Sequence, residues 1–303
     1  MFACSVPVFR YALEYWHPDP YQIILKFDPS QTNNSKEIVD EIKKHRQNRS
    51  FILKKIKTSQ SNEQIILKYP ASTRIQENVY ENSLTKENFI KILQSPVRQK
   101  LIDKITGGDS LIFLLLEGSN KKQNNHIANI ILKNIPILEN EIKLPHEYAD
   151  IPKEDLQIYN TNIVFKLSMM RLSRTNSEEN VFINILTRSL PESIYKKSQP
   201  IVFPIFGRGR MLAAIREKNL NTETLRRWCE YIAGECSCEI KSRNPGFDTF
   251  IPIGWNLEEK KELISEVILP PLSGFSEFMP PQKSVSTNSL TKNIKKTSRV
   301  KIK

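Results

Sequence analysis

The chain lacks any long hydrophobic run. Its longest unbroken aliphatic and aromatic stretch is residues 111–116, far short of the roughly 20 residues that a transmembrane helix requires. Residues 1–3 also carry neither the charged region nor the apolar core of a signal peptide. The sequence therefore predicts no membrane-spanning helix, and it leaves open that the leader of an exported protein is missing before Met1.

The patterns of the common enzyme classes are missing as well. No Ser-His-Asp arrangement, no helix with metal-binding histidines and carboxylates and no Walker loop occurs. The 4 histidines lie in expected loops or on polar faces, so general acid–base catalysis has few candidates. These absences favour a protein without enzymatic activity, for which we expect no catalytic residue and no cofactor.

Acidic residues are missing from the C-terminal end. None follows Glu277, whereas seven Lys and Arg residues lie between Lys283 and Lys303 and supply more than half of the net charge of +12. We expect residues 270–303 to be a disordered basic tail that can contact an anionic membrane surface. Because the rest of the chain is only mildly basic, nucleic acid is not the favoured partner.

What the first half does contain is an alternation of strands and helices. Hydrophobic periodicity predicts strands at 21–27, 51–57, 64–69 and 110–116, and helices at 7–16, 36–46, 86–106 and 124–143. Ser95-Pro96 is expected to divide the helix at 86–106 into two. This order favours an α/β domain over residues 1–145 that resembles a thioredoxin-like layer, followed by a linker at 146–160.

The second half predicts a different order. Strands at 163–172, 201–206, 210–216 and 247–255, with helices at 178–190 and 222–234, give the β-α-β-β-α-β order of a ferredoxin-like domain over residues 161–256. Such a sheet has its second and fourth strands at its edges, where Pro204 and Pro252 would be tolerated. A C-terminal helix is expected at 257–269.

Four cysteines form the most informative pattern. Cys236-Ser237-Cys238 follows the helix at 222–234, and Cys4 lies just before the first helix. They can form disulfides, react as thiols or bind metal, with Cys229 or a histidine completing a metal site, and the spacing does not decide among these. The histidines are His17, His45, His126 and His146.

Two of the cysteines permit a sharper expectation. Thioredoxin-like redox proteins deliver a reactive cysteine on a strand to a helix N-terminus, but only three residues precede Cys4, and Pro7 holds the place of a resolving cysteine. We therefore expect Cys4 to lie near Cys236 or Cys238. Cys229 shares a helical face with Leu225 and is expected to be a buried core thiol.

The segment Gly207-Arg208-Gly209-Arg210 resembles a phosphate loop at first sight. A true phosphate loop joins a strand to a helix, whereas this one joins two strands. A hairpin turn with glycine at positive φ is therefore the expected structure. Arg208 and Arg210 remain candidates for binding an anion at its tip.

Four segments together carry a family resemblance. They are the run from Ala3 to Trp16 with Asp19-Pro20-Tyr21, Gly108-Asp109-Ser110, the run from Phe203 to Arg210, and Cys236-Ser237-Cys238 with Asn244-Pro245-Gly246. The chain resembles a family of bacterial proteins predicted to be exported, which has no established activity. The resemblance covers about residues 3–255, and it implies that Cys4 follows an export signal.

The sequence thus favours an exported envelope protein, periplasmic or membrane-anchored, that acts as a non-catalytic binding or assembly module with structural cysteines. Its partner would be a protein of the cell envelope. One alternative is a thiol-redox or metal-handling protein that uses Cys4, Cys236 and Cys238. A second is a cytoplasmic protein that binds nucleic acid through its tail.

Overall fold

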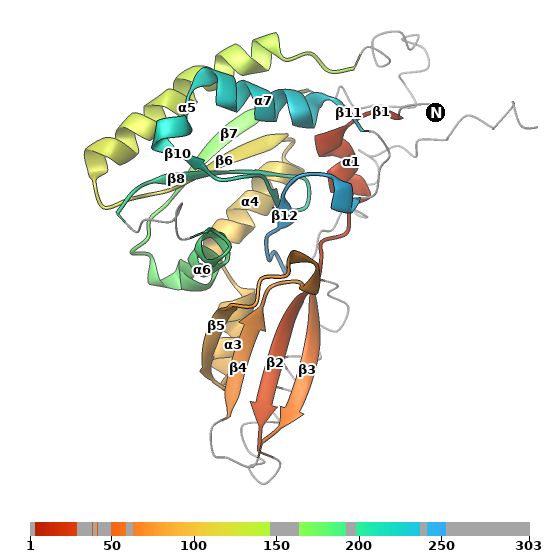
Figure 1. Ribbon diagram of the computed structural model, residues 1–303, viewed down its shortest axis with the longest axis vertical. Coiled ribbons are helices and arrows are strands. Elements are labelled where there is room, and N and C mark those ends of the chain that lie inside the picture. Colours follow the sequence, from red (N-terminus) through yellow and green to blue (C-terminus); the bar gives the residue numbers. More distant parts are fainter. Residues whose placement is uncertain are drawn as a thin grey trace, which may run out of the picture. The chain divides into compact units, whose positions relative to one another are not determined.

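The computed structural model describes residues 4–28, 38, 41, 50–58, 63–145, 164–191, 198–236 and 241–252. The chain divides into a first unit, Met1–Ile264, which holds all described residues, and a second, Ser265–Lys303, which lies outside them. The described part is a mixed α/β structure with a four-stranded mixed sheet, a six-stranded mixed sheet and one two-stranded pair (Figure 1). The expected mixture of helices and strands is confirmed.

The four-stranded sheet has the order β3-β2-β4-β5. Its strands are β2 (Tyr21–Phe27), β3 (Phe51–Lys57), β4 (Gln64–Lys68) and β5 (Asn78–Ser83). β2 runs parallel to β3 and antiparallel to β4. Alternate residues of β2 are buried in one cluster with Phe89 of helix α3 (Lys86–Leu93) and with Ile38, so this face of the sheet is the core face.

The six-stranded sheet has the order β12-β9-β8-β6-β7, and β10 also pairs with β8. Its strands are β6 (Leu111–Leu116), β7 (Leu167–Leu172), β8 (Ile201–Phe206), β9 (Arg210–Met211), β10 (Ile215–Arg216) and β12 (Phe247–Asp248). β6 and β7 are parallel, whereas β8 is antiparallel to β6.

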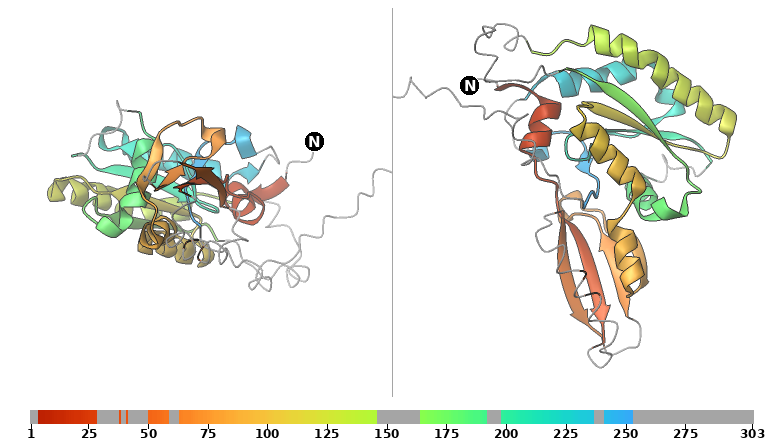
Figure 2. Two further views of the ribbon diagram at one scale, coloured as in Figure 1. Left: turned by 90° about the horizontal axis from the view of Figure 1, so that it is seen from below. Right: turned by 180° about the vertical axis from the view of Figure 1, so that it is seen from behind.

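Strand β6 organises the core because every one of its residues is buried. Leu111, Phe113 and Leu115 belong to one cluster, with helices α5 (Lys121–Glu141) and α7 (Thr222–Ala233). The alternate residues of β6 belong to the other cluster, with α4 (Pro96–Thr106) and α6 (Asn180–Arg188). Helices therefore cover both faces of this strand, which explains why its sequence is continuously apolar (Figures 1 and 2).

The expected break between two helices is confirmed at Ser95-Pro96. The Ser95 hydroxyl accepts a hydrogen bond from the backbone N–H of Arg98 at 3.0 Å, and Pro96 is the first residue of α4. The buried Glu179 carboxylate accepts a second bond, from the N–H of Val97 at 2.8 Å. Two free N–H groups at the start of α4 are thus satisfied inside the protein.

The hairpin expected at residues 207–210 is confirmed, with Gly207 at φ +56 and Gly209 at φ +89. The strand expected at 210–216 is interrupted: β9 and β10 both pair with β8, but the register shifts by one residue between them. The interruption lies opposite Pro204, which has no N–H to donate, although its carbonyl accepts a bond from Leu212 at 2.9 Å.

The ferredoxin-like arrangement over residues 161–256 is not confirmed. β6, from the first half of the chain, lies between β7 and β8, and β12 pairs with β9. The expectation that the strand containing Pro204 lies at a sheet edge is wrong, because β8 pairs on both sides. Residues on the two sides of 146–160 share one sheet, so the expected boundary does not separate two sheets.

The remaining described elements are short. β1 (Cys4–Pro7) leads into α1 (Val8–Glu14), and β11 (Glu235–Cys236) follows α7. Single 3-10 turns span Ala71–Thr73, Ser177–Glu179, Glu217–Asn219 and Lys241–Arg243. Of the helix expected at 36–46, residues 38 and 41 are described and helical. The linker at 146–160, the helix at 257–269 and the tail at 270–303 lie outside the described residues.

Candidate functional site

Cys4 and Cys236 face each other across the β1–β11 pair. The two strands are antiparallel, and Cys4 is the Cα partner of Cys236 (Figure 1). Facing Cα atoms in antiparallel strands lie about 4.5–5.5 Å apart, which falls within the range of roughly 4.4–6.8 Å that a disulfide needs. The backbone therefore brings together two of the three candidate cysteines; Cys238 lies outside the described residues.

The end of α7 holds this strand pair in place. The helix stops at Gly234, whose carbonyl accepts a hydrogen bond from the backbone N–H of Val8 at 3.0 Å. Val8 is the first residue of α1, so the start of α1 is attached to the end of α7. Pro7 pairs with Glu235, and the register shifts between this pair and the cysteine pair. Strand β1 therefore leads directly into a helix whose first residue is hydrogen-bonded to the end of α7.

Cys229 is a core thiol, as the sequence predicted. It is fully buried on α7 with Leu225 and Ile232. Burial raises the pKa of the Cys229 thiol to about 12. Because the thiolate is the nucleophile and the metal ligand, Cys229 is unsuited to both roles.

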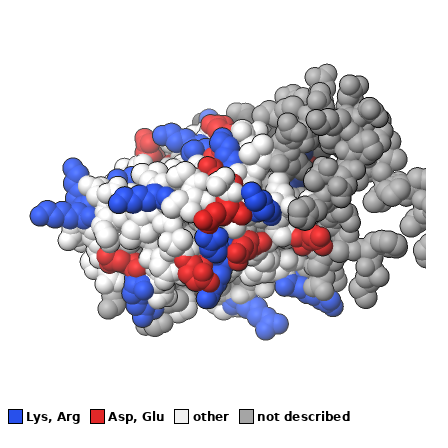
Figure 3. Space-filling view, turned by 90° about the horizontal axis from the view of Figure 1, so that it is seen from above, with Lys and Arg blue, Asp and Glu red and all other residues white. Residues whose placement is uncertain are grey.

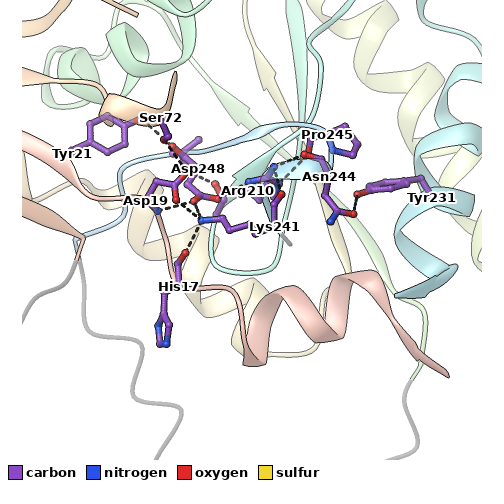
Figure 4. A network of polar contacts seen from close by, with 12 residues as sticks. His17, Asp19, Tyr21, Ser72, Arg210, Tyr231, Lys241, Asn244, Pro245 and Asp248 are labelled. Atoms are coloured by element: carbon purple, nitrogen blue, oxygen red, sulfur yellow. Dashed lines mark hydrogen bonds and ion pairs between the residues drawn. The ribbon is translucent and has the colours of Figure 1, made fainter. Parts of the chain in front are cut away.

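A polar network lies at the C-terminal side of α1 (Figure 4). The ammonium group of Lys241 donates to the Asp19 carboxylate at 3.1 Å, to the Asp248 carboxylate and to the carbonyl of His17. Asp248 also accepts from the backbone N–H of Asp19 at 2.8 Å, and its carbonyl accepts from the Tyr21 hydroxyl at 3.1 Å. The network joins the start of β2 to the segment 241–248.

Arg210 belongs to the same network and is buried. Its guanidinium donates to the carbonyls of Pro245 at 2.9 Å and Asn244 at 2.6 Å, and it lies 3.4 Å from the Asp248 carboxylate. The ring of Trp16 covers it at 5.4 Å. Arg210 therefore has no exposed guanidinium that could bind an anion as expected, because its N–H groups already donate to acceptors of the protein itself.

Arg208 caps helix α1. Its Nε donates to the carbonyl of Leu13 at 2.6 Å, and one terminal nitrogen donates to that of Glu14 at 2.9 Å. Cations are favourable at helix C-termini, where carbonyl groups lack partners. Burial lowers the pKa of Arg208 from its ordinary value. Both arginines of the hairpin thus stabilise the structure at the base of α1.

The strand-to-helix junction at the end of β6 contains no thiol. In thioredoxin-like redox proteins this kind of junction carries the reactive cysteine, because a helix N-terminus stabilises a thiolate. Here Gly118 and Ser119 lead to Asn120, whose side chain accepts bonds from the N–H groups of Lys122 and Gln123. Asn120 is a structural N-cap, so the junction has no group for thiol chemistry.

Asp109, from the motif Gly108-Asp109-Ser110, forms a second polar centre at the start of β6. Its carboxylate accepts from Lys166 at 2.7 Å and from the Ser168 hydroxyl at 2.6 Å. Burial by itself raises the pKa of the Asp109 carboxyl, but these bonds and the charge of Lys104 outweigh burial and hold the pKa below its ordinary value. The contacts attach the start of β6 to β7.

Metal binding finds little support among the described residues. No group of three histidine, cysteine or carboxylate side chains in this part of the chain is arranged to hold an ion. His17 lies with its Nδ1 3.4 Å from Arg208, and His45 and His146 lie outside the described ranges. Within the described residues, no helix has the length and apolar composition needed to cross a membrane.

The surface over α5 and α7 mixes charges of both signs (Figure 3). Arg226 pairs with Glu141 across the two helices, and Arg227 pairs with Glu223 at 3.1 Å. No single-sign field covers this face in the described part of the chain. The face therefore lacks the basic footprint expected of a nucleic-acid-binding surface.

No family model matches the chain, and no curated protein matches it. Among solved structures, the chain is similar to the first two thioredoxin domains of Eps1p from Naumovozyma dairenensis, at 11% sequence identity and a TM-score of 0.20. The match covers 71% of this chain and 97% of the other.

Sequence reasoning did not find the network around Lys241 and Asp248. His17, Asp19 and Tyr21 lie more than 200 residues from Lys241 and Asp248 in the chain, so no local spacing reveals the network. Asn244-Pro245-Gly246 and Asp19-Pro20-Tyr21 entered only as parts of the family resemblance. The carbonyls of Asn244 and Pro245 are acceptors for Arg210.

Proposed function

We propose that this protein is a non-catalytic binding or assembly module of the bacterial cell envelope, with structural cysteines. The observation that carries the proposal is the placement of Cys4 opposite Cys236 on the β1–β11 pair. Disulfides persist in oxidising compartments outside the cytoplasm, so a cross-link at this position suits an exported protein. The family resemblance of the N-terminal motif supports the same compartment.

The fold proposal that accompanies this function is a thioredoxin-like unit built from β6, α5, β7, α6, β8, β9 and α7. It replaces the thioredoxin-like layer expected over residues 1–145. Two parallel strands, β6 and β7, are followed by an antiparallel hairpin on the other side of β6. A separate ferredoxin-like domain is not part of the proposal, since β6 lies between β7 and β8.

The described cysteine chemistry supports a structural over a catalytic role. The junction at Asn120 lacks a thiol, and burial suppresses the reactivity of Cys229. A thioredoxin-type exchange needs an accessible thiolate and a resolving partner in one short motif. Neither requirement is met by the described residues, so the unit is proposed to use its fold for binding.

The redox potential of the protein tests this proposal. Purified protein is equilibrated with dithiothreitol buffers of known potential, and the fraction of bridged Cys4 is measured by alkylation and mass spectrometry. We expect a potential below about −300 mV, as for structural disulfides, and no acceleration of insulin reduction. A potential between about −270 and −120 mV together with insulin reduction would establish the redox alternative instead.

A further inference from the structure

The four-stranded sheet has a second face, opposite its core. Residues directly paired in register share a face, and the side chains along each strand alternate between the two faces. Gln22 pairs with Ile52 and Lys68, and Ile24 pairs with Lys54 and Ile66. We call the set opposite the core the outer face: Gln22, Ile24, Lys26, Ile52, Lys54, Ile56, Gln64, Ile66 and Lys68, together with Asn78, Glu81 and Ser83 of β5.

The outer face is apolar and open along β3, whereas Ile66, on β4, is only 4% exposed. Ile52 and Ile56 are 49% and 45% exposed, although β-branched residues of this size usually pack against another layer. Both lie on β3, and the half-buried Ile24 lies beside them on β2. Helix α3 and Ile38 join the cluster of the opposite face, so no described helix packs on the outer face.

Three lysines lie around these isoleucines. Lys54 donates to the side-chain oxygen of Gln22 at 2.7 Å, and Lys26 donates to that of Gln64 at 3.3 Å. Lys68 pairs with Gln22 in the register. Among the described residues no carboxylate is ion-paired with Lys26 or Lys54. Three lysines against one exposed glutamate, Glu81, give the outer face a net positive charge around its isoleucines, which is complementary to an acidic amphipathic surface.

We infer that the outer face docks an acidic amphipathic helix of a partner protein. Ile52 and Ile56 would receive the apolar stripe of that helix, and Lys26 and Lys54 would pair with carboxylates bordering the stripe. A helix is the usual cover for a sheet with one unpaired apolar face. The inference deepens the proposed binding function by naming the chemistry of the partner.

Two other modes of binding are disfavoured by the same residues. A second copy of the chain on this face would set lysines against lysines, since the surface is not self-complementary. Addition of a partner strand to the edge of β3 is disfavoured because lysines on an edge strand oppose such pairing. These lysines are Lys54, Lys55 and Lys57, all exposed.

A labelled synthetic helix tests the inference. The probe is a fluorescein-labelled 18-residue peptide with a leucine stripe bordered by glutamates, and its matched control carries lysines in place of the glutamates. We expect saturable binding of the acidic peptide by fluorescence anisotropy and at least tenfold weaker binding of the basic one. The Ile52→Ser/Ile56→Ser variant should weaken acidic-peptide binding at least tenfold, and Lys26→Gln/Lys54→Gln about three- to tenfold.

Leu132→Ser is the matched control, because Leu132 is 51% exposed on α5, away from the outer face, and should leave binding unchanged. The inference is overturned if no saturable binding is seen at millimolar protein, or if the Ile52→Ser/Ile56→Ser variant binds like the wild type. Tighter binding to phosphatidylglycerol vesicles than to the acidic peptide would overturn it in favour of a membrane. Loss of self-association in that variant would overturn it in favour of a second copy. The redox measurement above is independent of all these readouts.

Discussion

Replacing Cys4 by serine should destabilise the protein only when the cysteines are oxidised. A bridge between Cys4 and Cys236 closes a loop of about 230 residues. The chain-entropy model gives an upper value of about 5 kcal/mol for such a loop, and native strain commonly reduces this to about 2–4 kcal/mol. The expected loss in melting temperature is about 5–15 °C for a unit of this size.

The assay is thermal and urea unfolding of wild type and Cys4→Ser, each with and without reductant. Without reductant, Cys4→Ser and Cys236→Ser should lose the same stability, and the double variant should lose no more than either single variant. In reductant all of these proteins should unfold together. Cys238→Ser is the matched control and should behave like the wild type in both conditions.

The reasoning is refuted if Cys4→Ser and wild type are equally stable under oxidising conditions. The choice of Cys236 as the partner of Cys4 is refuted if Cys238→Ser loses stability and Cys236→Ser does not. Cys236 is the residue whose Cα faces that of Cys4, so Cys236→Ser and Cys238→Ser should differ although the two positions are only two residues apart.

Three further predictions concern the polar contacts and one turn. Asp248→Ala should lower the free energy of unfolding by about 3–5 kcal/mol in urea titrations, because Arg210 and Lys241 lose a buried partner. Glu223→Ala, which removes one partner of an exposed pair, should cost less than about 1 kcal/mol. Equal losses in the two variants would contradict this account. The Asp109 carboxyl has a lowered pKa when folded, so its contribution is present above the unfolded pKa of about 3.9 and is lost as pH falls through the folded value. Asp109→Asn should therefore cost about 1–3 kcal/mol at pH 7, and this cost should shrink as the pH falls below about 3.9; a cost that stays the same across the acid range would be inconsistent with it. Gly246→Ala should lower the melting temperature more than Gly108→Ala. Both glycines have positive φ, but only at Gly246 would an added Cβ lie 2.3 Å from a backbone carbonyl oxygen, that of Met211. Similar melting temperatures for the two variants would contradict the clash.

Local features of the fold were predictable from the sequence. The continuous apolar run at 111–116 indicated a buried strand, and β6 is one because helices cover both of its faces. Ser95-Pro96 indicated a helix boundary, and α4 begins there, with Ser95 as its N-cap and Pro96 as its first residue. Each of these signals depends on a few neighbouring residues, whose conformational preferences survive in the folded protein.

The sheet order was not predictable in the same way. β6 pairs with β7 and β8, which follow it by more than 50 residues, and hydrophobic patterns do not specify such partners. The rule that proline is tolerated at sheet edges also led to a wrong prediction of an edge strand. Pro204 lies in a strand paired on both sides, but it faces the place where the ladder to β9 and β10 is interrupted, so no donor is missed there.

The candidate site shows the same division. We expected Cys4 near the Cys236-Ser237-Cys238 segment because only three residues precede it. Cys4 does pair with Cys236, but the premise that no strand delivers it to a helix was wrong, since Cys4 begins a short strand, β1, that leads into α1. Arg208 and Arg210 were expected at an exposed hairpin tip. Instead α1 and the segment 241–248 pack around the hairpin and accept their hydrogen bonds, which only the tertiary structure reveals.

Peptide mapping without reductant tests the central claim of structural cysteines most directly. Trypsin should release a fragment ending at Arg10 joined by a disulfide to the fragment 228–241, which contains the other three cysteines. Cleavage after glutamate then separates Cys229 from Cys236, and the Cys238→Ser variant should retain the link. We predict one bridge, Cys4 to Cys236, with Cys229 free. A free Cys4 thiol in the oxidised protein, or a bridge that disappears in Cys238→Ser, would contradict the account.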